Sequence, residues 1–468
     1  MKYIFNFFIK KFLNFKNKNI FKILKKLIKK NILKIYYIWN IKELRIRIFN
    51  TLFYLIIYRF STFIPLPGIK NKDLNKYILI NHPNFNGMIQ IFYSFTGGCF
   101  LKYSILSLGL MPYISSSIMI QLLSYLIPYL QKLQKEGDSG NNQIIKLTRL
   151  LTLLISFIQS YFYIFILKNN LLPILIQDKN PYIFNIKNIY FKTYFYLLST
   201  ILLVTGTIFT MWLGEMISNK GIGNGISLII MIGIIVNFPN SFINEIYYKK
   251  KKFTLFLEII LFIIIISFSI AIFNLVKKIP IIYVKNSLLL KKKKIKYIYN
   301  YFSIKVLHSG VLPIIFSQSM MFFPIIYLYI NKKMNLIGTN WYVFFYNLSF
   351  FLFIIIFTYF YNNINLQESN ISENLKKNYS YIPEVAPGKQ TEEYLSKILK
   401  KITIPGSILL GLLSLFPNLS RLIGITENFS LFYGGSSLLI TIGVLIDLLQ
   451  IIETFILNSY YDKIVIKY

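Results

Sequence analysis

Long apolar segments recur along the whole of the 468-residue chain, and most of them carry no charged residue in their middle. A helix needs about 20 apolar residues to cross the hydrocarbon core of a bilayer. The segments that approach this length are 46–64, 105–127, 150–168, 194–214, 226–243, 255–276, 309–330, 342–361, 402–420 and 435–457. The sequence therefore predicts an all-α multi-pass membrane protein with ten transmembrane helices.

The polar connections between these segments predict the orientation of the chain. The N-terminal tail and the loops 128–149, 277–305 and 362–401 fall on one side of the membrane and carry most of the lysines and arginines. The positive-inside rule makes this side, with both termini, cytoplasmic, or stromal in a plastid. Abundant Lys, Ile, Asn, Phe and Tyr indicate an A+T-rich genome. We expect the membrane to be a bacterial cytoplasmic membrane or a plastid membrane. The lysine run 249–252 falls on the opposite side and does not fit the rule.

Ten spans divide into two halves of five, and an odd number of spans in each half gives the halves opposite orientations. We divide the chain into a basic low-complexity N-terminal extension, 1–44, an N-terminal half, 45–254, and a C-terminal half, 255–468. The cytoplasmic loops of the C-terminal half are 277–308 and 362–401. The extension has no cleavable signal-peptide pattern and is either a solvated tail or, in part, a basic helix on the membrane surface.

The residue chemistry excludes several classes of function. The single cysteine, Cys99, excludes a disulfide framework, and with His82 and His308 it leaves too few soft ligands for a zinc or iron–sulfur site. The acids in or near the spans are scattered: Glu215, Glu258, Asp447 and Glu453. We therefore expect no enzyme, no metal and no cofactor. The formal charge of +35 lies mainly between the apolar segments, facing lipid headgroups or RNA-bearing partners, and we expect no direct nucleic-acid substrate.

A shorter apolar segment, 86–104, is interrupted by Gly97 and Gly98 and cannot cross a bilayer. Non-helical backbone at membrane depth is tolerated only inside protein or beside a water-filled cavity. The segment therefore predicts either a re-entrant piece beside such a cavity or an external loop helix.

Three polar features stand out against the apolar background. Gln121 lies in an apolar helix, so its amide needs a partner on a neighbouring helix or in a wet pore. The glycine-rich segment 221–225 lacks the spacing and the preceding strand of a phosphate-binding loop, and we interpret it as a turn. In the last long loop, Pro387 and Gly388 predict a turn, and Thr391 is suited to cap the helix that follows.

Several motifs together resemble the SecY family, in unbroken order from about residue 45 to the C-terminus. They are FIPLPGI at 63–69, GLMPYISSSIMIQLL at 109–123, KEGDSG at 135–140, VTGTIFTMWLGEMISNKGIGNGISLII at 204–230, SGVLPIIFSQS at 309–319, PGKQTEEYL at 387–395 and YGGSSLLITIGVLIDLLQ at 433–450.

The resemblance implies a clamshell of two inverted five-helix halves around an hourglass pore. Such a channel translocates unfolded polypeptides and releases hydrophobic segments sideways into the bilayer. The matching pore-ring positions are Leu110, Ile114, Ile230, Ile315 and Ile440, and the matching plug positions are Phe95, Thr96, Gly97, Gly98 and Cys99. The lateral gate matches Ser117, Gln121 and Gln318, and the cytoplasmic docking loops match Lys291, Lys292, Lys293, Lys294, Pro387, Gly388 and Lys389.

The resemblance also implies partners. These are a SecE-like small membrane subunit and, at the cytoplasmic loops, a SecA-like ATPase, a ribosome or both. The resemblance leaves open whether a SecG-like third subunit binds. The substrates would be signal peptides and unfolded preproteins.

This chain departs from the family pattern at Ala386, where an arginine is usual, at Asn141 and Asn142, where a basic pair is usual, and at Leu307, where an asparagine is usual. These departures bear on motor coupling and on the energetics of the gate. The alternative function is an inverted-repeat secondary transporter, which requires ion or substrate ligands on broken helices at the midplane.

Overall fold

The computed structural model describes residues 39, 41–67, 96, 99, 103–177, 189–249, 252–284, 297–308, 310–321, 340–365, 368–422, 424–430, 432–433 and 435–465. Its helices are α3 (Lys42–Ser61), α6 (Met111–Leu126), α7 (Pro128–Lys135), α8 (Asp138–Gln177), α9 (Ile189–Lys220), α10 (Gly225–Tyr248), α11 (Lys252–Phe273), α12 (Leu312–Met320), α14 (Asn340–Asn365), α15 (Glu368–Lys377), α16 (Lys389–Leu422), α17 (Glu427–Ser430) and α18 (Gly435–Val465). Its strands are β1 (Val276–Val284), β2 (Tyr297–Lys305) and β3 (Ser380–Tyr381).

Each of the ten predicted spans overlaps a helix of the described chain. Seven of these helices are long and apolar enough to cross a membrane: α8, α9, α10, α11, α14, α16 and α18. The pair α6 and α7 passes the same test as one bent span. The count of ten stays a prediction, because α3 carries Arg45, Arg47 and Arg59 and the described part of α12 is only nine residues long.

The bend between α6 and α7 follows from Pro128. The two helices meet at 103°, and Ile127 between them has extended backbone, with φ −100° and ψ 115°. A residue that precedes proline is driven out of the helical region, so the helix ends there and a new one begins at the proline.

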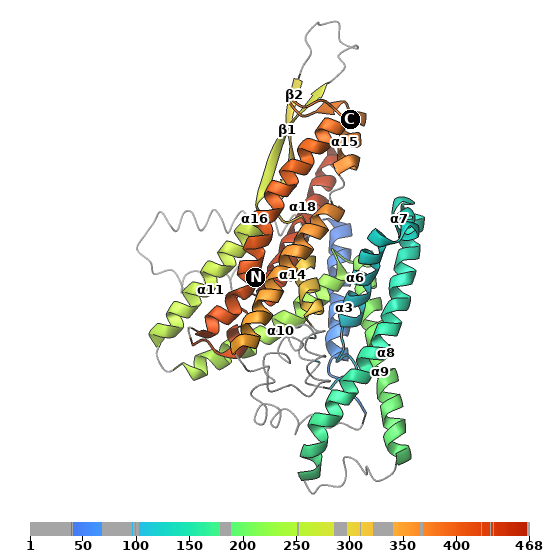
Figure 1. Ribbon diagram of the computed structural model, residues 1–468, viewed down its shortest axis with the longest axis vertical. Coiled ribbons are helices and arrows are strands. Elements are labelled where there is room, and N and C mark those ends of the chain that lie inside the picture. Colours follow the sequence, from blue (N-terminus) through green and yellow to red (C-terminus); the bar gives the residue numbers. More distant parts are fainter. Residues whose placement is uncertain are drawn as a thin grey trace.

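The helices form two groups that lie side by side (Figure 1). In the first helix group, α3 to α10, α8 packs against α6 and α9, and α3 packs against α9. In the second helix group, α11 to α18, α14 packs on α16, and both α11 and α16 pack on α18. The groups meet mainly along two seams: the α10 seam, where α10 contacts α17 and α18, and the α6 seam, where α6 contacts α12.

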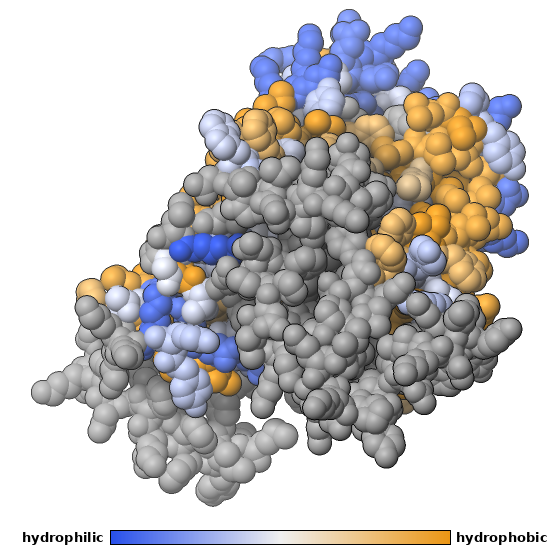
Figure 2. Space-filling model, turned by 60° about the horizontal axis from the view of Figure 1, so that its bottom comes forward, coloured by the Kyte–Doolittle hydropathy of each residue, from blue (hydrophilic) through white to orange (hydrophobic). Residues whose placement is uncertain are grey.

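Many large apolar side chains face outward rather than inward. Examples on the long helices are Leu154, Ile158, Phe256 and Ile263, each more than half exposed. Figure 2 shows such side chains gathered on the flank of the molecule, with hydrophilic ones at one end. A helix that is apolar on all sides needs an apolar surrounding, and lipid supplies it.

The glycine-rich segment 221–225 is the turn that the sequence predicts. It joins α9 to α10, with Gly223 at φ +76°, and the Asn224 side chain accepts hydrogen bonds from the amides of Ile226 and Ser227. A Cβ atom on Gly225 would lie 2.0 Å from the carbonyl oxygen of Gly214, so glycine lets α9 and α10 approach closely.

A small antiparallel sheet, in the order β2-β1-β3, projects from the helices (Figure 1). Ile279 of β1, Ile304 of β2 and Ile382 pack with Leu395 and Leu399 of α16 in a separate buried cluster. The helical class holds for the membrane part, and this sheet is an addition that the sequence reasoning did not anticipate. Strand pairing gives the loops 277–308 and 362–401 an ordered base.

Candidate functional site

Five aliphatic side chains from distant parts of the sequence lie in one buried cluster. They are Leu110, which precedes α6, Ile114 of α6, Ile230 of α10, Ile315 of α12 and Ile440 of α18. All five are at most 6% exposed. The five predicted ring positions thus lie in the same apolar core, which spans both helix groups.

The described part of the predicted plug is packed under the start of α6. Thr96 and Cys99 are 2% and 0% exposed, and Phe95, Gly97 and Gly98 lie outside the described residues. The Ser107 hydroxyl donates a hydrogen bond to the Cys99 carbonyl oxygen at 3.3 Å. Gly109 has φ +53°, and a Cβ atom there would be in ordinary van der Waals contact with the Thr96 methyl carbon, at 3.4 Å.

Backbone hydrogen bonds tie the two ends of the segment that contains the plug to each other. The amide of Leu66 donates to the carbonyl oxygen of Tyr103 at 2.8 Å, and the amide of Ile105 donates to that of Ile64 at 3.0 Å. The chain after α3 therefore returns to its starting point immediately before α6.

The three predicted gate residues have different surroundings. Gln121 of α6 accepts a hydrogen bond from the Tyr361 hydroxyl of α14, which joins the two helix groups. The Gln318 amide donates to Ser436 of α18, inside the second helix group. Ser117 is half-buried and donates to the carbonyl oxygen of Ile114 in its own helix at 3.1 Å.

Tyr361 is a residue that the sequence reasoning missed. It is 4% exposed, and its ring lies 4.8 Å from that of Phe316 on α12. With 36 tyrosines in the chain, residue type alone did not distinguish it.

The predicted docking loops are partly described. Pro387 and Lys389 are exposed at the start of α16, and Gly388 has φ +108°, as the predicted turn requires. The prediction that Thr391 caps this helix is wrong, because α16 already begins at Lys389. The Thr391 hydroxyl instead donates back to the Ala386 carbonyl oxygen at 2.8 Å. Lys291, Lys292, Lys293 and Lys294 lie outside the described residues.

Among the described residues, no group of three or more His, Cys, Asp or Glu side chains could hold a metal ion. The site consists instead of aliphatic side chains, one hydrogen bond between the helix groups and a packed segment under α6.

The comparisons with known proteins decide the family. The SecY family model matches residues 104–449. The protein translocase subunit SecY of Buchnera aphidicola subsp. Schizaphis graminum is 35% identical over 443 residues, which cover 91% of this chain and 95% of that protein. The chain belongs to the SecY family.

Solved structures share the SecY fold with this chain. One, described as the structure of a protein conducting channel, has a TM-score of 0.57 at 13% identity and covers 88% of this chain and 92% of its own. Another solved structure, described as showing that the plug domain of the SecY protein stabilises the closed state of the translocation channel, has a TM-score of 0.55 at 14% identity. It covers the same shares of the two chains.

The departures from the SecY pattern have clear places in the structure. Leu307 is 3% exposed and belongs to the main apolar core. Asn141 and Asn142 are exposed at the start of α8, and Ala386 is exposed in the turn before α16. Leu307, where the sequence resemblance predicts an asparagine in the family, is thus part of the apolar packing.

Proposed function

We propose that this chain forms the channel of a protein translocase, through which unfolded polypeptides cross the membrane. The observation that carries the proposal is that the five predicted ring residues, all aliphatic, are buried in the one apolar core that spans both helix groups. A narrow aliphatic constriction disfavours water and ions, while its side chains deform around a passing peptide without a sequence preference.

The segment 86–104 is the plug of this channel. The support is the packing of Thr96 and Cys99 directly before Leu110, the first ring residue. A buried apolar piece at that place blocks the constriction at rest, and its displacement opens the path.

The lateral gate lies along the α6 seam. The contacts of α6 with α12, and the hydrogen bond between Gln121 and Tyr361, are the interactions that must yield when the seam opens. A segment in the open gate then divides between pore and lipid according to its own apolarity.

The energy for translocation comes from partner proteins that dock on the channel. The sheet β1–β3 with α15 and the start of α16 is the docking platform for a SecA-like ATPase or a ribosome on the cytoplasmic or stromal side. Its support is an ordered base with exposed Lys389 beside it. A SecE-like small subunit completes the complex in a bacterial or plastid membrane, and the chain itself has no enzymatic activity.

The test is single-channel conductance in planar bilayers, with the chain co-expressed with its small membrane partner. The intact protein is expected to be silent, and deletion of residues 92–100 is expected to give large, weakly selective openings. Silence of a folded deletion variant contradicts a plugged channel and favours the transporter alternative.

A further inference from the structure

Three charged side chains meet where α10 joins α11. Glu245, near the end of α10, is 2% exposed, and Glu258 of α11 is 4% exposed. Lys249 follows α10 directly and places its Nζ atom 2.6 Å from Glu258 Oε1. Removing a charge from water costs much free energy unless the charge is paired, so the partners of these three side chains must stay in place around them.

Both acids are held by residues of the opposite helix group. Glu245 belongs to the first helix group, and its Oε2 atom accepts hydrogen bonds from the amide of Thr426, at 3.2 Å, and from the Thr426 hydroxyl, directly before α17. Glu258 belongs to the second helix group and is paired with Lys249 of the first. The Tyr433 hydroxyl fixes α11 from the other side by donating to the Glu258 carbonyl oxygen at 2.6 Å.

Aromatic rings exclude water from this place. The neighbouring ring centroids lie between 5.3 and 6.3 Å apart, and the rings are those of Phe238, Phe242, Phe262, Phe429, Phe432 and Tyr433. They come from α10, α11 and the chain around α17. In such a dry surrounding, charge pairing is stronger than at a wetted surface.

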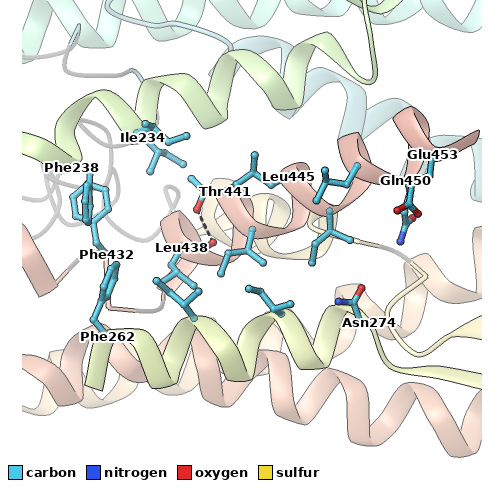
Figure 3. Close-up of a pocket in the computed structure, with 16 residues that line it drawn as sticks. Ile234, Phe238, Phe262, Asn274, Phe432, Leu438, Thr441, Leu445, Gln450 and Glu453 are labelled. Carbon is cyan, nitrogen blue, oxygen red and sulfur yellow. Dashed lines mark hydrogen bonds between the residues drawn. The ribbon is translucent and has the colours of Figure 1, made fainter. Parts of the chain in front are cut away.

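Beyond the rings, α10, α11 and α18 line an open, mainly apolar pocket of about 710 Å³ (Figure 3). Phe238, Phe262 and Phe432 bound one end of it, and Asn274, Gln450 and Glu453 line the other.

We propose that Glu245, Lys249 and Glu258 form a latch at the α10–α11 connection, which fixes the angle between the two helix groups and keeps the channel closed at rest. The proposal rests on the proposed channel function and adds positioning residues to it. It also gives Lys249 of the run 249–252 a role, because this lysine compensates a buried acid. Within the described chain, Glu245 Oε1 and Glu258 Oε2 have no hydrogen-bond partner, so the latch is not fully satisfied and can yield.

The test uses charge reversal and charge exchange in the complex with its small membrane partner. Lys249→Glu and Glu258→Lys each place two like charges together, and the double variant exchanges them. The matched control is Glu215→Gln, because Arg149 and Glu215 form a 2.7 Å ion pair between α8 and α9, inside the first helix group. The readout is the frequency of openings without substrate in planar bilayers, with the 92–100 deletion as the open reference.

We expect each reversal to raise the opening frequency about tenfold or more, the exchange to return it near wild type, and the control to leave it unchanged. If the reversal variants fold and stay silent while the deletion variant conducts, the latch is refuted and the proposed channel function still holds. Failure of the exchange to restore silence overturns charge pairing as the cause. A silent deletion refutes the closed channel itself.

If the reversals do not fold, the neutral double variant Lys249→Met with Glu258→Gln serves in their place. It removes both charges without creating repulsion, and it is expected to open more often than wild type. Equal frequencies in a folded protein refute the latch.

Discussion

Replacing Tyr361 with phenylalanine tests the hydrogen bond that joins the two helix groups at the gate. The substitution removes one hydroxyl and keeps the ring that packs on Phe316. The lost interaction is the bond to Gln121, which connects α14 to α6. Because this bond exists only while the helix groups are together, its loss destabilises the closed state relative to the open one.

The size of the effect follows from the burial of the two partners. An acceptor that is left buried without a donor costs about 1–3 kcal/mol. Gln121 is half-buried, so water can partly replace the lost donor, and the expected cost is about 1 kcal/mol. That corresponds to a roughly fivefold shift of the closed–open equilibrium.

The assay is lateral insertion of a series of segments with graded apolarity. A leucine at the centre of a segment contributes about 0.3–0.6 kcal/mol to insertion. Tyr361→Phe should therefore lower the number of leucines that a segment needs for insertion by about two. The control is Tyr359→Phe on the same helix, where the side chain is 40% exposed. An unchanged threshold in Tyr361→Phe, or an equal shift in Tyr359→Phe, would show that the bond between Tyr361 and Gln121 does not hold the gate closed.

Two further substitutions test the fold around the site. Gly225→Ala should force α9 and α10 apart, because its Cβ atom would meet the Gly214 carbonyl oxygen. We expect the free energy of unfolding, measured by thermal unfolding, to fall by about 1–3 kcal/mol. Gly137→Ala, with nothing within 4 Å, should cost only its backbone strain, and equal losses would contradict this explanation. Partial burial, and to a smaller extent the charge of Lys305, lower the pKa of His308 below its ordinary value of 6.5. Below about pH 6.5 the unfolded chain therefore binds more protons at this residue than the folded chain does. Stability should therefore fall from that pH down to the lower folded pKa, less steeply in His308→Gln, and identical pH profiles would count against it.

The membrane helices could be predicted from the sequence because lipid demands long apolar segments, and each predicted span overlaps a helix. The ring residues could be named only through the family motifs, since one isoleucine in an apolar helix resembles any other. The turn at Asn224 was predictable because its glycines and cap are local in sequence.

Other features depend on contacts that a single sequence does not reveal. Gln121 and Tyr361 are 240 residues apart, and Glu245 and Thr426 are 181 apart. The strands β1 and β2 were missed because isoleucine and lysine are abundant throughout the chain and hide a period of two. Lys249 did not fit the charge rule because its partner, Glu258, is buried in the protein.

Site-specific cross-linking shows whether a polypeptide passes through the ring of aliphatic residues. A photoreactive side chain is placed at Ile230, Ile315 or Ile440, with Phe256, a 60%-exposed residue of α11, as the outward-facing control. The reconstituted complex is then stalled with a preprotein halfway across the membrane. We expect cross-links to the preprotein from the ring positions and none from Phe256. An absence of cross-links from the ring, or equal cross-linking from Phe256, would contradict this expectation.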